Sequence, residues 1–438
     1  MPDLHNDRSI VVHQTSEIER YAAWLLSMAV AVAVFFQVHV SFPAGPINVN
    51  LADPLSALAL AGIALHSVFL RQGPLWRVDH FNGVLGVMAC LILLSFIHGW
   101  MVVGITQWSL FGRLFGGMVL AGYIAAGYLI VASAGTHGLR RFAETMISTA
   151  AVVVMLQICL RLLCSVGVIS CTHVAFNFEG YAGNRNAFAF QLLVGVALLC
   201  AYSGLYGRHR NQCSRSSKAY ILALLLGILL AGICWTGSRT GMITAAIVLL
   251  VSIFGKVGDL RLISRGAVLA VVMWSGVWLL EHKELLPIWD LFPVREFLPF
   301  DVRIQSTLVN ETSNYEHWAT VTKGFEMWKQ SPIWGAGLGV FYAQSPSWLG
   351  HPQVIHNTAV WVLAEFGLLG ALGFGWAYLK VAGYAIRIRG ILPSQHILIL
   401  LLLVFSVFSI MHEIAYQRIF WLALGAALAR PFALKHST

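Results

Sequence analysis

The residues best suited to chemistry are His356 and Asn357, which are followed after nine intervening residues by Gly367-Leu368-Leu369-Gly370. A histidine can act as a general base near neutral pH, and an asparagine can orient a hydroxyl-rich substrate by hydrogen bonding. The alternative interpretation is that His356 is only a polar residue at a helix start. His351 is a weaker candidate, and Glu365 should lie deeper along the same helix as an acidic partner or a structural polar group.

Arg239 is the most informative cation. It stands in Thr236-Gly237-Ser238-Arg239-Thr240-Gly241, between two apolar stretches that leave almost no room for a loop. A guanidinium offers planar, bidentate donors to phosphate oxygens, and N–H groups at the start of the next helix can add to them. The alternative is an arginine that extends toward lipid headgroups.

Two further arginines lie near the ends of apolar stretches. Arg185 follows Asn184 in a Gly-Asn-Arg-Asn segment; it either anchors the helix start, where Asn184 or Asn186 can serve as the cap, or binds phosphate. Arg161 is expected to face a cavity or to pair with Glu179, because an isolated charge at membrane depth is costly. For Arg113 and Arg418, which lie nearer to loop margins, the lipid interface is the favoured location.

The elements that must position these residues are membrane helices. Apolar residues make up 58% of the chain, charged residues 11%, and the mean hydropathy is +0.75, far from soluble proteins. Long continuous runs favour helices over barrel strands. We therefore predict an all-α polytopic membrane protein with about twelve spans, centred in 21–40, 52–70, 82–103, 114–133, 142–168, 186–206, 218–236, 240–256, 266–281, 358–386, 395–412 and 415–433.

Basic residues gather in alternate loops. Of the 28 lysines and arginines, 18 fall in one set of loops and in the two termini, so this side is expected to face the cytoplasm. The net charge of +9 is thus a topology signal and gives no support to nucleic-acid binding. No cleavable signal peptide is apparent, and the first apolar run should stay as a span.

The sequence predicts a single integral domain, 1–438, whose one large loop, 282–355, lies on the outer face between spans nine and ten. Within the loop, 316–329 has the spacing of an amphipathic helix, with Trp318, Val321, Phe325 and Trp328 on one side. Residues 335–339 are rich in glycine. A disulfide between Cys164 and Cys171 is chemically allowed on this face.

Metal and nucleotide chemistry find no support in the sequence. The sixteen histidines are scattered, and no Cys or His pattern has the spacing of metal ligands. A P-loop, a dinucleotide fingerprint and a G-x-S-x-G elbow are also missing. An enzyme of this kind would use no cofactor, and the energy would have to come with the substrate.

At these positions the chain resembles the O-antigen ligase family, within the wider O-antigen ligase and polymerase superfamily. The pattern His356-Asn357-x9-Gly367-x-x-Gly370 matches the ligase motif. The turn at 238–241, the segment 183–186 and the run 332–341 add to the resemblance, which covers about 180–375 by motif. Many superfamily members carry an arginine shortly before the tryptophan equivalent to Trp318; this chain has Asn314-Tyr315-Glu316-His317, and its nearest loop arginine is Arg303.

The resemblance implies a glycosyltransferase-C-like fold in the bacterial inner membrane. It also implies transfer of a glycan from undecaprenyl diphosphate to a sugar hydroxyl of lipid A-core on the periplasmic face, with inversion and without metal. Arg185 and Arg239 would stabilise the departing diphosphate, with Arg161 and Arg303 as helpers. His356 would act as the base, and Asn357 would orient it or the acceptor.

Three other functions remain open. A polymerase of the superfamily would use the same donor but a lipid-linked repeat as acceptor. A protein O-oligosaccharyltransferase would glycosylate a serine or threonine. A secondary transporter would more often show two related halves and ionisable residues near the midplane, whereas here the unusual charges gather toward the outer ends of spans.

Overall fold

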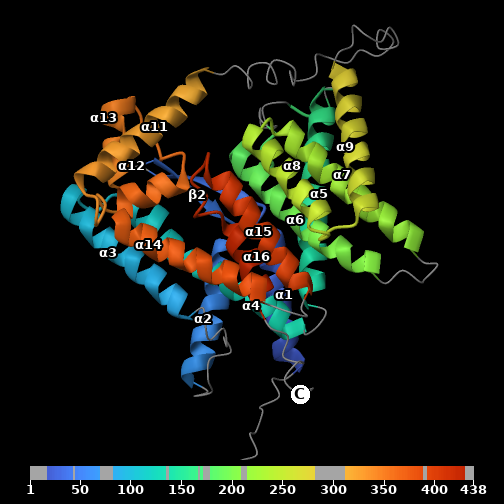
Figure 1. Cartoon of the computed structure of the whole chain (residues 1–438), viewed down its shortest axis with the longest axis horizontal. Coiled ribbons are helices and arrows are strands. Elements are labelled where there is room, and N and C mark those ends of the chain that lie inside the picture. The colour runs from blue at the N-terminus through green and yellow to red at the C-terminus, as the bar shows by residue number, and fades with distance from the viewer. Residues whose placement is uncertain are drawn as a thin grey trace, which may run out of the picture.

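The computed structural model describes residues 17–42, 45–69, 82–134, 138–165, 168–170, 178–208, 215–281, 311–387 and 392–429. Helices dominate these residues (Figure 1), which confirms the predicted all-α class. Each of the twelve predicted spans overlaps one of the following: α1 (Glu17–Ala33), α2 (Asp53–Phe69), α3 (Asn82–Val103), α4 (Gly116–Ala134), α5 (Gly138–Ser165), α6 (Arg185–Arg208), α7 (Arg215–Trp235), α8 (Arg239–Phe254), α9 (Leu260–Glu281), α14 (Thr358–Arg387), α15 (Leu392–Ser409) and α16 (Arg418–Leu428).

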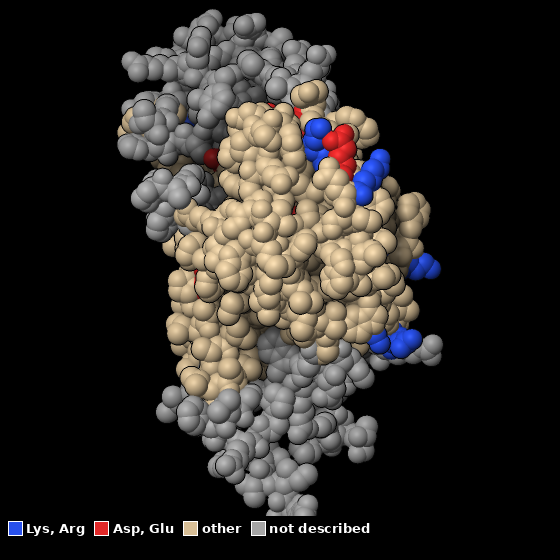
Figure 2. Space-filling model, turned by 90° about the vertical axis from the view of Figure 1, so that its left-hand side faces the viewer, with Lys and Arg blue, Asp and Glu red and all other residues tan. Residues whose placement is uncertain are grey.

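Among the described residues, six helical stretches are long and apolar enough to cross a membrane: Gly83–Val103, Trp108–Ser133, Gly138–Cys164, Arg185–Ser203, Ser217–Trp235 and Thr358–Arg387. Shorter apolar helices accompany them, and the total of twelve spans stays a prediction. Figure 2 shows a broad face on which the described residues are almost all uncharged, with Lys, Arg, Asp and Glu at its margin. Such a face suits contact with lipid.

The structure corrects the first predicted span, 21–40, at its C-terminal end. There the chain forms a hairpin of β1 (Gln37–Phe42) and β2 (Gly45–Asn50), which pair antiparallel. The hairpin is tied to the segment before α6, because the Gln37 N–H donates to the Tyr181 carbonyl at 2.9 Å. Polar and apolar residues alternate in β1, which is a strand pattern. Because β1 follows directly after an apolar run, the first predicted span extended into it.

The core surrounds α6, which packs against α5, α7, α8 and α15. Its side chains at Leu192, Leu193 and Val196 are completely buried. A second close approach joins α4 and α16, where a Cβ on Gly127 or Gly425 would strike backbone atoms of the other helix. Because α6 and α8 pack together, their first residues, Arg185 and Arg239, lie at neighbouring helix starts.

Helix α14 is broken at Gly367, whose φ of 66° and ψ of −161° are not helical. This backbone conformation is essentially restricted to glycine. A Cβ here would also strike the carbonyl oxygen of Ile333. The first glycine of the motif therefore redirects the helix.

The glycine-rich segment 332–339 supplies the hydrogen bonds that the break removes from α14. Four backbone hydrogen bonds join the two segments, with these donors and acceptors: Ala336 to Ala364 at 2.8 Å, Gly337 to Glu365 at 3.1 Å, Leu368 to Pro332 at 2.9 Å, and Leu369 to Ile333 at 3.2 Å. In apolar surroundings no water replaces a lost backbone partner. The break and the glycine-rich segment therefore depend on each other.

Two arginines expected at the lipid interface are instead held in ion pairs inside the protein. Arg113, on the π-helix η1 (Trp108–Phe115), is only 3% exposed and binds Glu413 at 2.8 Å. Arg418 contacts both carboxylate oxygens of Asp53, at 2.6 and 2.8 Å. The lipid interface predicted for both was wrong, because each cation is stabilised by an anionic partner from a distant part of the chain.

The predicted helix 316–329 is present as α11 (Glu311–Gln330), but a different face is buried. Thr320 is completely buried, whereas Trp318 of the predicted apolar stripe is 74% exposed. A Cβ added to Gly324 would lie against Val360 and Ile355. Small residues thus let α11 approach the segment that leads into α14. Two short helices, α12 (Val340–Gln344) and α13 (Pro346–Leu349), lie between α11 and α14 in the chain.

Replacing Gly367 by alanine tests the break in α14. We expect Gly367→Ala to destabilise the protein by about 1–3 kcal/mol or more, because an alanine side chain is strained in this backbone conformation and meets the Ile333 carbonyl. The matched control is Gly375→Ala on the same helix, where an added Cβ meets nothing within 4 Å. Thermal unfolding in detergent checks both variants; equal Tm values would contradict this account of the break.

Candidate active site

His356 lies immediately before α14, and its neighbour Asn357 starts that helix. The Asn357 Oδ1 accepts a hydrogen bond from the Val360 N–H at 2.9 Å, as an N-terminal cap does. The backbone N–H of His356 donates to Thr320 Oγ1 of α11 at 3.3 Å. The position of His356 is therefore fixed from two sides, by the cap of α14 and by α11.

Asn357 and Thr358 also hold the loop between α15 and α16. The Asn357 Nδ2 donates to the carbonyl of Ile410 at 2.7 Å, and Thr358 Oγ1 donates to the carbonyl of His412 at 2.8 Å. The Ile414 N–H donates in turn to Thr358 Oγ1 at 3.2 Å. These bonds bring His412 next to His356. Both polar atoms of the Asn357 side chain have protein partners, and its predicted part in orienting His356 or the acceptor stays a prediction.

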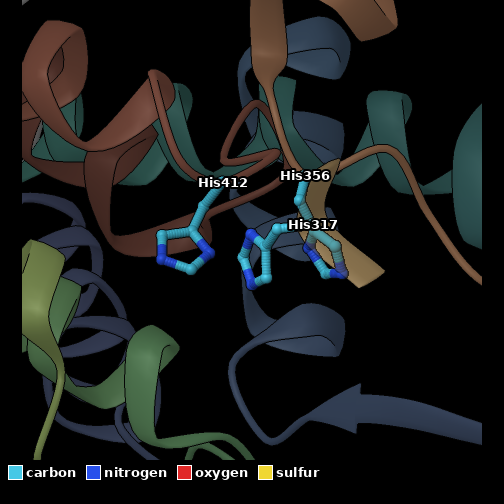
Figure 3. A group of neighbouring side chains, drawn as sticks. All are labelled: His317, His356 and His412. Atoms are coloured by element: carbon cyan, nitrogen blue, oxygen red, sulfur yellow. The ribbon is translucent and has the colours of Figure 1, made fainter. Parts of the chain in front are cut away.

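Three imidazole rings meet at this place (Figure 3). The ring of His317, from α11, stacks on that of His356 with 4.0 Å between centroids, and lies 5.4 Å from the ring of His412. Sequence analysis singled out His356 but missed the other two. For His317 the available signal was its place beside Trp318, where relatives carry arginine; His412, at the end of a span, gave none.

The surroundings keep these histidines neutral at pH 7. Burial lowers the pKa of His356 to about 4, with a contribution from the neighbouring His317. Burial also lowers the pKa of His412 to about 3, helped by His317, His356 and Arg185. The pKa of His317 is lowered first by burial and then by the positive charge of Arg239. A neutral imidazole is the form that can accept a proton.

Arg185 and Arg239 lie close enough to the histidine cluster for their positive charges to lower histidine pKa values. Arg239 and, more weakly, Arg185 act on His317. The starts of their helices are joined, since the Ser238 hydroxyl donates to Asn186 Oδ1 at 2.7 Å. The two sequence candidates for phosphate binding thus share one site with His356.

A polar side chain caps each of the two helix starts. Ser238 Oγ accepts from the Gly241 N–H at 3.1 Å, so Ser238 caps α8. Asn184 Oδ1 accepts from the Asn186 N–H at 2.7 Å and serves as the cap of α6, one of the two predicted possibilities. A helix start presents N–H groups and partial positive charge to an anion, which adds to the arginine charges.

Arg161 is buried, at 6% exposure, and its guanidinium lies over the ring of Phe178 at 5.4 Å. Phe178 also contacts the rings of Phe188 and Trp235. Arg161 therefore supports the segment that leads into α6. Arg303 lies outside the described residues, so its predicted part stays a prediction. Cys164 is disulfide-bonded, but Cys171 also lies outside the described residues, and their pairing stays a prediction.

A buried polar network stands beside the histidines. The Arg113 guanidinium, paired with Glu413, lies 5.0, 5.1 and 4.6 Å from the ring centroids of Trp108, Trp361 and Tyr416. Glu365 is buried and accepts a hydrogen bond from the Trp361 indole at 2.8 Å. Since Glu413 follows His412 in the chain, this network anchors the loop that carries His412.

Comparison with known proteins agrees with the resemblance seen in the sequence. Residues 222–375 match the family model described as O-antigen ligase, consistent with the O-antigen ligase and polymerase superfamily, whose members are glycosyltransferase-like enzymes. The matched segment contains Arg239, His317 and His356, together with the glycine-rich segment and the broken helix. No significant match to a curated protein was found.

The histidine cluster predicts a dependence of stability on pH. The pKa values of His356 and His412 in the folded protein lie below the ordinary 6.5, so on acidification the unfolded chain takes up protons first. Their contribution to stability is complete above about pH 6.5 and is lost as the pH falls toward 4. We expect Tm in detergent to fall over this window, and less steeply in His412→Gln. In the control, exposed His351→Gln, the slope should equal that of the wild type; an unchanged slope in His412→Gln would contradict the prediction.

Proposed function

Starting from the O-antigen ligase match of residues 222–375, we propose that this chain transfers O-antigen polysaccharide from undecaprenyl diphosphate to a sugar hydroxyl of lipid A-core. The reaction takes place on the periplasmic face of the bacterial inner membrane, without metal and with inversion. One observation supports it most: Arg239 and Arg185 lie within electrostatic reach of His317, whose ring stacks on His356. Cations for a diphosphate and a base for a hydroxyl are thus side by side.

The arginines act on the leaving group. As the bond from the anomeric carbon to the diphosphate oxygen breaks, negative charge grows on the undecaprenyl diphosphate. Arg185 and Arg239, at the starts of α6 and α8, are placed to stabilise that charge together with the helix N-termini. Stabilisation that grows in the transition state raises the rate of the chemical step.

His356 acts on the acceptor. The hydroxyl oxygen of the core sugar attacks the anomeric carbon, and its proton passes to the neutral imidazole. Because a bound diphosphate places negative charge beside the cluster, the pKa of His356 rises in the complex above its value of about 4 in the free enzyme, which makes the imidazole a better base. A single displacement of this kind inverts the anomeric centre.

The remaining residues have supporting parts in this proposal. Asn357 positions His356 and the loop 410–412 through the hydrogen bonds of both its polar atoms. Arg161 supports the segment before α6 through Phe178. Arg303 is retained as a further phosphate ligand from the resemblance. The bilayer delivers both lipid-linked substrates.

Substitutions at His356 and Arg239 test the chemistry. Removing one donor from a site that stabilises transition-state charge costs about 100- to 1,000-fold in rate, so we expect His356→Ala and Arg239→Ala to lose at least about 100-fold. Arg239→Lys should recover only part of the loss, because lysine lacks the bidentate fork. The assay uses purified protein, defined undecaprenyl-diphosphate glycan and isolated core lipid, in EDTA.

Controls for this assay come from the same face of the protein. His351→Ala and Lys329→Ala replace exposed residues outside the histidine cluster and should transfer at the wild-type rate. Gel filtration and Tm verify that each variant is folded. Normal transfer by folded His356→Ala would refute its role as the base, and normal transfer by Arg239→Ala would refute the diphosphate site.

Deletion of the gene separates the proposed ligase from the other members of the superfamily. The expected result is loss of polymer-capped lipopolysaccharide, with polymer retained on undecaprenyl diphosphate, because only the final attachment is removed. Loss of the polymer itself would instead identify a polymerase, and intact capped lipopolysaccharide with unglycosylated protein would identify a protein glycosyltransferase. Analysis of lipopolysaccharide on gels, together with extracted lipid-linked glycan, makes the distinction.

A further inference from the structure

The three clustered histidines have a property that the transfer reaction does not need. Each offers a ring nitrogen, and these ligand atoms of His317, His356 and His412 all lie within 4.8 Å of one another. Nitrogen ligands of one tetrahedral zinc ion are about 3.4 Å apart when each lies about 2.0–2.1 Å from the metal. Because the rings of His317 and His356 are stacked, side-chain rotations that turn their nitrogens toward a common point would bring three imidazoles onto one ion.

The three rings are held by different parts of the chain, so the cluster exists before any ion arrives. The ring of His317 lies between the other two (Figure 3). The ring of His412 packs on Phe408 at 4.9 Å.

We infer that His317, His356 and His412 form a binding site for a divalent transition-metal ion such as Zn²⁺. Zinc sites are known in which three imidazoles bind the ion and its fourth coordination position is open to water or a substrate oxygen. Imidazole is also a suitable ligand for copper and nickel. The positive charge of Arg239 and Arg185 acts on the same side chains and opposes a cation. The binding is therefore reversible and weaker than in structural zinc sites.

Bound metal inhibits glycan transfer. This part of the inference rests on the proposed function, in which the His356 nitrogen accepts the proton of the acceptor hydroxyl. A nitrogen that ligates a metal ion has no lone pair left for that proton. The enzyme thus works without metal and is switched off when the ion occupies the cluster.

Metal binding is measured without reference to activity. Full-length protein without a polyhistidine tag is stripped with EDTA, freed of the chelator and titrated with Co²⁺, whose visible absorption reports tetrahedral nitrogen ligation. We expect one ion per chain in the wild type and in His351→Gln. His317→Gln and His412→Gln should each bind at least about tenfold more weakly, since even weakened support of a ligand costs about 10- to 100-fold. Equal Co²⁺ binding by the wild type and by a folded double variant that carries both His317→Gln and His412→Gln would overturn the site.

Inhibition is measured with Zn²⁺ in the transfer assay, and each variant is compared with itself in the absence of metal. Wild type and His351→Gln should lose activity in Zn²⁺ and regain it in EDTA. His412→Gln should need at least about a tenfold higher Zn²⁺ concentration to lose the same fraction of its activity. Full activity of Zn²⁺-loaded wild type would overturn the inhibitory effect. Absence of transfer by metal-free wild type would count against the proposed function alone, because the Co²⁺ titration still decides the site.

Discussion

The broken helix α14 constrains the rest of the site. Inside an apolar bundle, each backbone N–H and C=O needs a partner within the protein, and a helix that breaks at Gly367 leaves several without one. The segment 332–339 provides these partners and itself bonds to α3, where the Leu338 N–H donates to the Ser95 carbonyl at 2.9 Å. The segment from 332 to 356 is thereby hydrogen-bonded to the helix bundle where it begins.

Charged residues in this protein divide according to their partners. Arg113 and Arg418 are neutralised by Glu413 and Asp53 from distant parts of the chain, and they tie helices together. The charge of Arg239 instead reaches the histidine cluster. Because burial of an ion pair is stabilising only when both partners are present, the first two arginines serve the fold, while the position of the third suits an anionic substrate.

The histidine cluster combines burial with nearby positive charge. Both effects disfavour the protonated imidazole, so His356 stays neutral without a dedicated carboxylate partner among the described residues. The arrangement also makes the free site sensitive to what binds there. A bound anion offsets the positive charge beside the cluster, whereas a proton or a metal ion adds to it.

The amino-acid sequence was enough to predict the helices and to indicate a resemblance to the superfamily. Apolar runs long enough to cross lipid leave few alternatives to a helix, and the order of Arg239, His356 and the glycine motif was enough to indicate the family that matches 222–375. The hairpin after α1, the buried face of α11 and the ion pairs of Arg113 and Arg418 were not foreseen.

Only the tertiary structure decided that His317 and His412 join His356, and that Gly367 breaks α14 against a neighbouring segment. Sequence patterns report periodicity and length within one element. Contacts between segments far apart in the chain depend instead on how the helices pack, and no local pattern carries that information.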